Sequence, residues 1–354
     1  MLPDKSFNGS ILVAKNGEIV YEKYCGLVDL RKTGSIASST PIHIASAGKT
    51  LTAMAILQMA QENKLSLDDS LTKFFPGFPY PGITVKMLLN HRSGLPNYMY
   101  FISESKWDEK IYVTNNDVIN QLYLLKPLAN SPNTGFDYSN TNYVLLALII
   151  ERISGKTYPE YMRQRFFEPL QMKNTYVFIL ADTASATPSF NYDGSYWQND
   201  FLEATYGDKN IYTTPRDLLK WQQALLSGRI INKELLDSAF TPYSFEKKTI
   251  HNYGLGWRLA IFPNNKKIVY HFGRWHGFNA AFAFLPDEEV SIIVFGNRFN
   301  RGIYNAVHDC YSLFGDYWEK QKIIDEDSDS TDNSIDTLSQ KIAPHFLKTL
   351  SKKK

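Results

Sequence analysis

Residues 42–60 read IHIASAGKTLTAMAILQMA, and the interpretation of the whole chain depends on this stretch. From Lys49 to Ala60 strong helix formers follow one another with almost no polar face, which predicts a helix buried on every side. The polar residues of the stretch gather at its beginning, around Ser46 and Lys49. We therefore expect this end of the helix to face a cleft, where chemistry is favoured.

Ser46 and Lys49 lie three positions apart, a spacing that places a hydroxyl and an amine on one face of a helix. A lysine that is desolvated in a closed cleft can take the serine proton and so activate the hydroxyl as a nucleophile. The spacing alone is weak evidence, because it occurs five times, starting at Ser46, Ser70, Ser103, Ser244 and Ser351. Among these, only Ser46 opens a long buried helix directly after an apolar entry. The structural alternative is a helix N-cap, which a lysine in the first turn disfavours.

Two further short motifs contain residue types suited to the same chemistry. In Tyr138-Ser139-Asn140, a tyrosine near cations can act as a general base and an amide can orient a carbonyl. In His271-Phe272-Gly273, the glycine lets a substrate backbone approach the end of a strand closely. The structural alternatives are a packed tyrosine beside an asparagine cap, and a strand-end histidine bonded to a neighbouring backbone group.

Strand patterns occur at both ends of the chain, with helix patterns between them. Asn16-Gly17 is a strong hairpin signal. The predicted strands are 11–15, 19–24, 253–261, 267–272, 279–285 and 290–295, and the predicted helices include 84–91, 142–153, one opening at Thr157, one from Thr214 to about Leu226, and 301–320. This order predicts an α+β fold, with one antiparallel sheet built from N- and C-terminal strands, flanking helices and a mostly helical lobe.

The expected organisation is a catalytic unit over residues 1–320, followed by a different kind of segment. Its α/β lobe covers about 1–60 and 210–320, and its helical lobe covers about 61–209. Residues 321–354 are an acidic linker and a short tail, which we expect to be flexible.

Composition narrows the classes of function. The net charge of +2 gives no electrostatic footprint for nucleic acid, and no run of apolar residues is long enough to span a membrane. The cysteines lack zinc-ligand spacing, and Cys25 and Cys310 could either form one disulfide or remain free thiols. The start of the chain is not a signal peptide, so we expect either an exported protein without its signal or a cytoplasmic one. The oligomeric state stays open.

Taken in order, the three motifs resemble the serine β-lactamase and penicillin-binding-protein superfamily. Within this superfamily, the sequence most resembles the branch of class C β-lactamases, D-Ala-D-Ala carboxypeptidases, D-aminopeptidases and related esterases. The likeness covers roughly residues 8–315, and it includes the segments 83–96, 130–145, 168–172 and 212–218.

The resemblance implies a serine hydrolase that forms an acyl-enzyme on Ser46. Lys49 and Tyr138 would share the proton transfers, and either could be the base. Asn140 would hold the substrate amide, and the backbone N–H groups of Ser46 and Arg274 would form the oxyanion hole. The resemblance implies a small-molecule or peptide-like substrate and neither a metal nor an organic cofactor.

Two departures from the family pattern bear on the substrate. His271 stands where many members have lysine, and it is less reliably charged at neutral pH. Phe272 stands where penicillin-recognising members have a serine or threonine hydroxyl that helps to bind a carboxylate, although Arg274 or His276 could compensate. We therefore expect poor β-lactamase activity and an esterase or D-amino-acid peptidase specificity. The alternatives are a β-lactamase or D-Ala-D-Ala carboxypeptidase, and a catalytically silent binding or scaffold relative.

Overall fold

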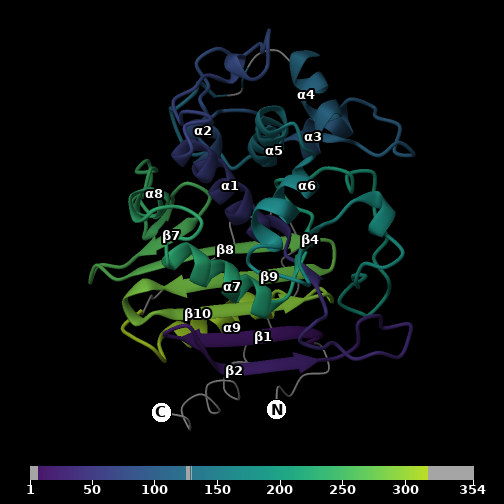
Figure 1. The fold of residues 1–354 in the computed structure, drawn as a ribbon. Helices are drawn as coiled ribbons and strands as arrows, with labels where there is room; N and C mark the ends of the chain where they lie inside the picture. The colour runs from purple at the N-terminus through teal and green to yellow at the C-terminus, as the bar shows by residue number, and fades with distance from the viewer. Residues whose placement is uncertain (1–6, 125–127, 129, 318–354) are drawn as a thin grey trace.

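A seven-stranded antiparallel sheet forms the base of the molecule in the computed structural model, which describes residues 7–124, 128 and 130–317 (Figure 1). The strands follow the order β2-β1-β10-β9-β8-β7-β6. Their bounds are β1 Gly9–Lys15, β2 Glu18–Cys25, β6 His251–Tyr253, β7 Arg258–Ile261, β8 Lys267–Trp275, β9 Phe278–Leu285 and β10 Val290–Gly296. Because β1 pairs with β10, the predicted sheet of N- and C-terminal strands is confirmed.

A second sheet of three short strands lies beside the start of the long buried helix. It consists of β3 (Ile42–His43), β5 (Ile211–Thr213) and β4 (Tyr176–Val177), in that order. The backbone N–H of Ile44 also donates to the carbonyl of Ile211 (2.9 Å). The entry to the helix is therefore fixed to a segment that lies far away in the sequence.

Nine α-helices occur in the described part of the chain. They are α1 Lys49–Gln61, α2 Val85–Leu89, α3 Tyr98–Glu104, α4 Asn115–Leu124, α5 Asn140–Ser154, α6 Tyr158–Met162, α7 Pro215–Leu226, α8 Lys233–Ala239 and α9 Gly302–Tyr311. Thr157 and Thr214 cap α6 and α7 as their sequences predict, each accepting a backbone N–H three residues on. None of the described helices is both long and apolar enough to cross a membrane.

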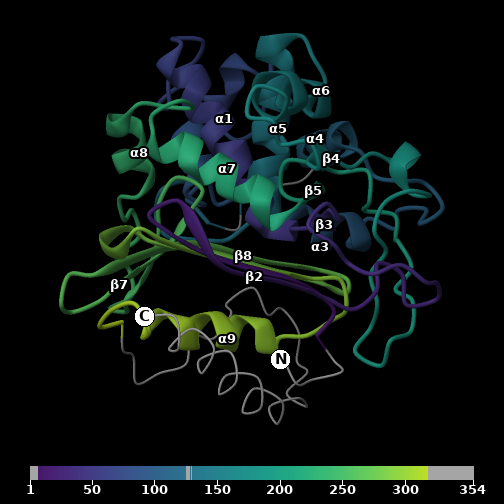
Figure 2. The same cartoon turned by 60° about the horizontal axis from the view of Figure 1, so that its bottom comes forward.

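The two faces of the sheet bury two different cores. Helix α9 packs against one face, whereas α1, α7 and the other described helices lie on the opposite side (Figure 2). Strand β8 shows the alternation: Val269 belongs to the core around α1, while Tyr270 and Phe272 belong to the core under α9. Residues Lys49 to Met59 of α1 are all buried, so the helix predicted to be buried on every side is confirmed.

The structure changes several boundaries of the sequence-based prediction. Residues 45–48 form a 3-10 turn, so the helix begins at Lys49 and not at Ser46. The predicted strand 253–261 is a hairpin of β6 and β7, because the chain turns where Gly256 has a φ of +86° and a Cβ there would meet Ala53 at 2.3 Å. The last predicted helix ends at Tyr311.

The predictions for the cysteines and for the tail have different outcomes. Cys25 and Cys310 are both free, so the disulfide alternative is wrong. Cys310 lies on α9 and is fully buried there, and Cys25 is half-buried on β2. The predicted linker and tail, 321–354, lie outside the described residues.

Candidate active site

Ser46 lies in a tight turn that the fold holds in an uncommon conformation. The preceding residue, Ala45, has a φ of +47°, a region that residues with a Cβ rarely occupy. The imidazole of His43 accepts the Ala45 N–H at Nδ1 (3.2 Å), and its burial lowers the pKa of His43 to about 3. A neutral, buried histidine therefore supports the turn, and Ser46 is half-exposed between buried neighbours.

Lys49 is completely buried directly behind the Ser46 hydroxyl. Its Nζ donates to Ser46 Oγ (3.0 Å) and to the backbone carbonyl of Asp208 (2.8 Å). It also lies 5.2 Å from the ring centroid of Tyr138 and 5.8 Å from that of Tyr143. Neither the 3-10 turn nor α1 has a side-chain cap, so the alternative that Ser46 is an N-cap is not supported.

Tyr138 lies between two cationic side chains, as the sequence motif requires. Besides Lys49, the guanidinium carbon of Arg258 lies 5.2 Å from the Tyr138 ring centroid. The ring of His271 is 6.4 Å away, centroid to centroid. The structure thus brings residues from α1, β7, β8 and the segment before α5 into one cluster.

His271 is a neutral member of this cluster. Its Nδ1 lies 2.7 Å from the carbonyl of Phe272, so Nδ1 carries the ring proton and donates it. Its Nε2 must then accept the Tyr253 hydroxyl proton at 3.0 Å. Burial, with the nearby charges of Arg258 and Lys49, holds the pKa of His271 well below its usual value. His271 therefore does not supply the positive charge that a lysine would supply at this position.

Gly273 packs directly against the backbone of the Ser46 turn. A Cβ at position 273 would lie 2.3 Å from the carbonyl oxygen of Ile44 and 2.8 Å from the backbone nitrogen of Ser46. Side-chain atoms do not fit at such distances, so only glycine allows β8 to lie this close. The next residue, Arg274, is half-buried, and the role of its backbone N–H in an oxyanion hole stays a prediction.

Phe272 points away from Ser46, to the other face of the sheet. It belongs to the core under α9 and stacks on Tyr304, with 5.1 Å between ring centroids. A side chain at position 272 therefore does not reach the cluster around Lys49. The sequence argument that a missing hydroxyl at 272 weakens carboxylate binding loses its geometric basis here.

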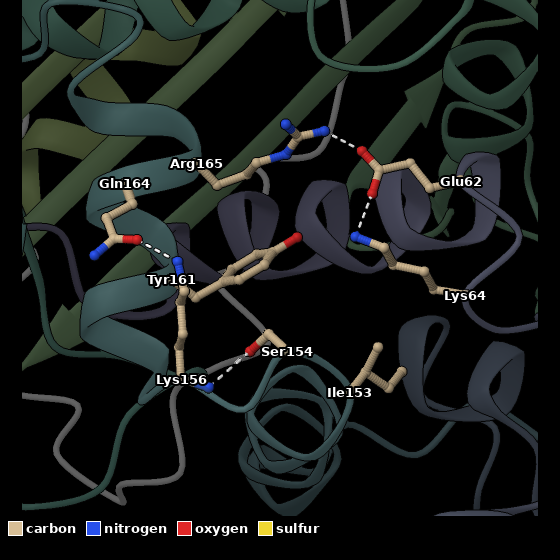
Figure 3. A pocket seen from close by; sticks show the side chains of 8 residues that line it. All are labelled: Glu62, Lys64, Ile153, Ser154, Lys156, Tyr161, Gln164 and Arg165. Carbon is tan, nitrogen blue, oxygen red and sulfur yellow. Dashed lines mark hydrogen bonds and ion pairs between the residues drawn. The ribbon is translucent and has the colours of Figure 1, made fainter.

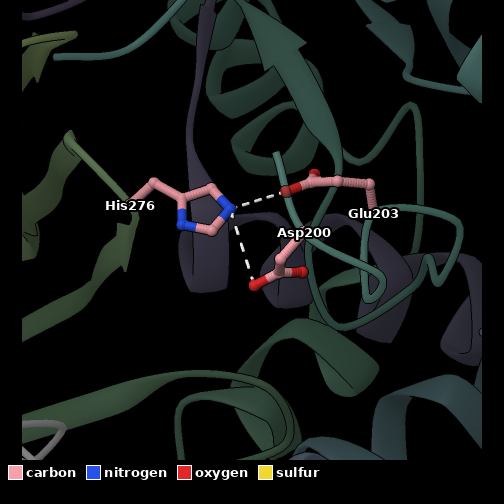
Figure 4. Close-up of side chains that lie close together, drawn as sticks. All are labelled: Asp200, Glu203 and His276. Atoms are coloured by element: carbon pink, nitrogen blue, oxygen red, sulfur yellow. Dashed lines mark hydrogen bonds and ion pairs between the residues drawn. The ribbon is translucent and has the colours of Figure 1, made fainter. Parts of the chain in front are cut away.

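Asn140 and His276 make contacts that the sequence does not indicate. Asn140 begins α5, and its amide nitrogen lies 3.1 Å from the sulfur of Met99, so its role toward a substrate carbonyl stays a prediction. His276, at the turn between β8 and β9, pairs with Glu203 (2.6 Å) and lies 3.9 Å from Asp200 (Figure 4). His276 is thus held by carboxylates and is poorly placed to receive a substrate carboxylate.

The group of Asp200, Glu203 and His276 has donor atoms of the kinds that bind metals, all within 4.8 Å of one another. The indole N–H of Trp275 also donates to the Glu203 carboxylate (3.1 Å). These bonds give the buried Glu203 carboxylate its partners, and they tie the β8–β9 turn to the segment before β5.

One pocket of the described residues lies at the other end of α1, away from Ser46 (Figure 3). With a rise of about 1.5 Å per residue, the helix separates the two places by roughly 20 Å. The pocket is lined by Glu62, Lys64, Ile153, Ser154, Lys156, Tyr161, Gln164 and Arg165. It contains neither the nucleophile candidate nor any of its contacts.

Sequence reasoning missed four residues that the structure places in or beside this cluster. They are His91, Asp208, Tyr253 and Arg258. A sequence signal for Asp208 did exist. Asp208 and Lys209 are two adjacent charged residues just before an apolar strand, and both are buried, which is unusual for charged side chains. Arg258 was hidden inside a stretch predicted to be a single strand, and no local pattern marks His91 or Tyr253.

Comparison with known proteins connects this geometry to a family. The family model described as Beta-lactamase matches residues 5–308. A penicillin-binding protein of Bacillus subtilis is 30% identical, over 94% of this chain and 77% of its own length. The structure of a penicillin-binding protein from Bacillus halodurans superposes with a TM-score of 0.78 at 26% identity, covering 87% of this chain and 96% of that one. A D-amino acid amidase from Ochrobactrum anthropi SV3 superposes with a TM-score of 0.69 at 25% identity, covering 83% and 87%.

The close approach of β8 to the Ser46 turn gives a first prediction. Gly273→Ala should lower kcat/KM for any substrate by at least about tenfold, because the added carbon must push the strand or the turn aside. The same strain should destabilise the fold by about 1–3 kcal/mol. Gly135→Ala is the matched control, since a Cβ there meets nothing within 4 Å. Equal activity of the two variants would contradict the packing described.

Three buried histidines and the largely buried His308 give a second prediction, on stability against pH. Burial lowers the pKa of His43 and His308 to about 3 and that of His91 and His271 well below the usual value. Below about pH 6.5 the unfolded chain therefore binds more protons than the folded protein, so the free energy of unfolding must fall as the pH falls. Each histidine contributes a slope of up to about 1.4 kcal/mol per pH unit.

Urea unfolding at several pH values between 7.5 and 5 measures this slope. His308→Leu removes one of the four groups and should make the slope shallower. A free energy of unfolding that stays constant or rises toward pH 5 would show that these histidines are not buried in their neutral forms.

Proposed function

Because this chain belongs to the beta-lactamase family, we propose that it is a serine hydrolase that forms an acyl-enzyme on Ser46. The family and its relatives support serine-hydrolase-type activity. The single observation that carries the assignment of the nucleophile is the 3.0 Å contact between the half-exposed Ser46 hydroxyl and the fully buried amine of Lys49.

In the proposed reaction, Ser46 Oγ attacks the carbonyl carbon of an ester or amide. Its proton passes to Lys49, since a neutral amine can accept it across the same 3.0 Å. The tetrahedral intermediate then expels the alcohol or amine, which receives a proton from the Lys49–Tyr138 pair. Water later hydrolyses the acyl-enzyme, with the same pair as the base. Lys49 is our choice for the first transfer because it is the group bonded to Ser46, and Tyr138 lies next to Lys49.

The oxyanion would be bound by backbone N–H groups at the junction of the Ser46 turn and β8. The proposed donors are those of Ser46 and Arg274. The contact of Gly273 with the turn supports this arrangement, because it brings the strand close to the Ser46 nitrogen. Donors held rigidly in such a place stabilise charge that appears in the transition state.

We propose D-amino-acid amides, esters or peptides as the substrate class. The superposition on a D-amino acid amidase supports it, at 25% identity over most of both chains. The neutral His271 also distinguishes this site from one with a second lysine on β8.

A second candidate, a D-Ala-D-Ala carboxypeptidase or β-lactamase, is favoured by one specific observation. The guanidinium of Arg258 lies beside the ring of Tyr138, so a cation suited to bind a carboxylate is present in the cluster. The similarity to penicillin-binding proteins supports the same candidate. A silent scaffold is disfavoured, because a site without activity has no reason to bury Lys49 against Ser46.

The nucleophile assignment predicts that Ser46→Ala abolishes hydrolysis of p-nitrophenyl esters and leaves Tm nearly unchanged. The hydroxyl is the attacking group, and its removal takes away one hydrogen bond from Lys49 and no apolar packing, so the core stays intact. Ser103→Ala is the matched control, since Ser103 starts another Ser-x-x-Lys sequence on the exposed side of α3. Turnover by Ser46→Ala at the wild-type rate would refute the assignment.

The two candidates differ in the role of Arg258. If substrates carry a free carboxylate, Arg258→Gln should raise KM for benzylpenicillin or D-Ala-D-Ala peptides by roughly tenfold or more, since a bond to a charged partner is lost. Hydrolysis of an uncharged p-nitrophenyl ester should change little. An equal loss on both kinds of substrate would exclude carboxylate binding by Arg258 as the basis of specificity.

Efficient nitrocefin hydrolysis by the wild type would refute the expected preference against β-lactams.

A further inference from the structure

His91 is a buried histidine in the cluster to which no catalytic step has been assigned. It follows α2 with a φ of +54° and has no exposed surface. Its ring lies over that of Tyr138, with centroids 4.3 Å apart and planes tilted by 34°. Tyr253 and Tyr143 also lie beside it, at 4.9 and 5.2 Å. His91 thus forms one wall of the space that Tyr138 occupies.

One nitrogen of His91 receives two hydrogen bonds from the segment that carries the catalytic tyrosine. The backbone N–H of Ser139 donates to His91 Nδ1 (3.2 Å), and so does the side-chain amide of Asn142 (3.0 Å). Ser139 is the residue between Tyr138 and Asn140. The imidazole is therefore bonded to the peptide that links two proposed site residues.

The direction of these bonds is fixed by the Ser139 peptide, because a backbone N–H can only donate and Nδ1 must therefore be an acceptor. The NH₂ end of the Asn142 amide must then face His91. The Ser93 hydroxyl donates to Asn142 Oδ1 (2.6 Å) and accepts the N–H of Leu95 (3.1 Å), which agrees with this orientation of the amide. His91 is consequently the tautomer with its proton on Nε2.

Its surroundings keep His91 in this neutral form. Burial, with the nearby charges of Lys49 and Arg258, holds the pKa of His91 well below its usual value. Nε2 has no hydrogen-bond partner among the described residues. A buried imidazole that is neutral at working pH, and whose basic nitrogen is already occupied twice, is unsuited to carry protons during turnover. Its contribution must come from what it holds in place.

We propose that His91 is a positioning residue for the reaction assigned above to Ser46, Lys49 and Tyr138. It acts through an acceptor at Nδ1, which fixes the Ser139 peptide, and through its ring, which fixes the plane of Tyr138. This inference rests on the proposed function. Small displacements matter in such a site, because a shift of about 1 Å in a catalytic group can slow a reaction by about 100-fold.

Two substitutions of His91 distinguish the effect of the hydrogen-bond acceptor from the effect of side-chain volume. In asparagine the side-chain oxygen is bonded to Cγ, as Nδ1 is in histidine, so His91→Asn can keep the two hydrogen bonds. His91→Leu keeps a similar volume and removes the acceptor, leaving two buried donors without a partner. We expect kcat on a p-nitrophenyl ester to fall by about 10- to 100-fold in His91→Leu and by less than about threefold in His91→Asn.

His308→Leu is the matched control for the loss of a largely buried, neutral histidine. His308 lies on α9 at the other face of the sheet, and its Nε2 also lacks a hydrogen-bond partner among the described residues. Its kcat should equal that of the wild type at a temperature well below Tm. If His91→Leu also keeps the wild-type kcat, or if both His91 variants lose activity equally while folded, the proposal is wrong.

One measurement on the wild type keeps the test decisive if a variant does not fold. In the wild type, a long-range ¹⁵N–¹H spectrum at pH 7.5 should show His91 protonated at Nε2 alone, and protonation at Nδ1 would overturn the proposal. Labelling of Ser46 by a fluorophosphonate distinguishes a failure of the proposed function from a failure of the role proposed for His91. Wild type that is never labelled contradicts the proposed function, whereas equal labelling rates in wild type and His91→Leu contradict only the role of His91.

Discussion

The removal of the Lys49 amine from water is the constraint on which the rest of this structure depends. An amine without exposed surface needs polar partners, and this one has the Ser46 hydroxyl, the Asp208 carbonyl and the faces of two tyrosine rings. Those partners come from the turn before α1, the segment before β5, the segment before α5, and α5 itself. A chain that folds so as to satisfy Lys49 has therefore already assembled the proposed catalytic groups.

The large sheet serves this arrangement by supplying a rigid edge beside the Ser46 turn. Strand β8 lies against the turn at Gly273, and the twofold alternation along the strand separates its roles. His271 and Gly273 face the cluster, while Tyr270 and Phe272 fill the core under α9. Ala45, which precedes Ser46, and His91, which lies beside Tyr138, both have a left-handed backbone, so local strain is present at two places in the cluster.

The fold class and the buried helix were predictable because each follows from local patterns, whereas Tyr138 was placed with Ser46 and Lys49 only by the resemblance to a family. Period and turn signals identify the strands, and the unbroken apolar run after Lys49 identifies the helix. The orientation of Phe272 and the bonds of His91 depend on pairings between distant segments, so no local pattern could give them. Arg258 escaped notice for a related reason: two glycines bend a stretch that reads as one strand, and that bend puts Arg258 beside Tyr138.

The central claim is that Ser46, with Lys49 behind it, carries the acyl group. The most direct test is peptide mapping by mass spectrometry after the folded protein has reacted with a fluorophosphonate or a fluorescent penicillin, for wild type and for Lys49→Ala. We expect one adduct, on the peptide that contains Ser46, and a much slower reaction in the variant. An adduct on another serine, or equal labelling of Ser46 without Lys49, would contradict this account.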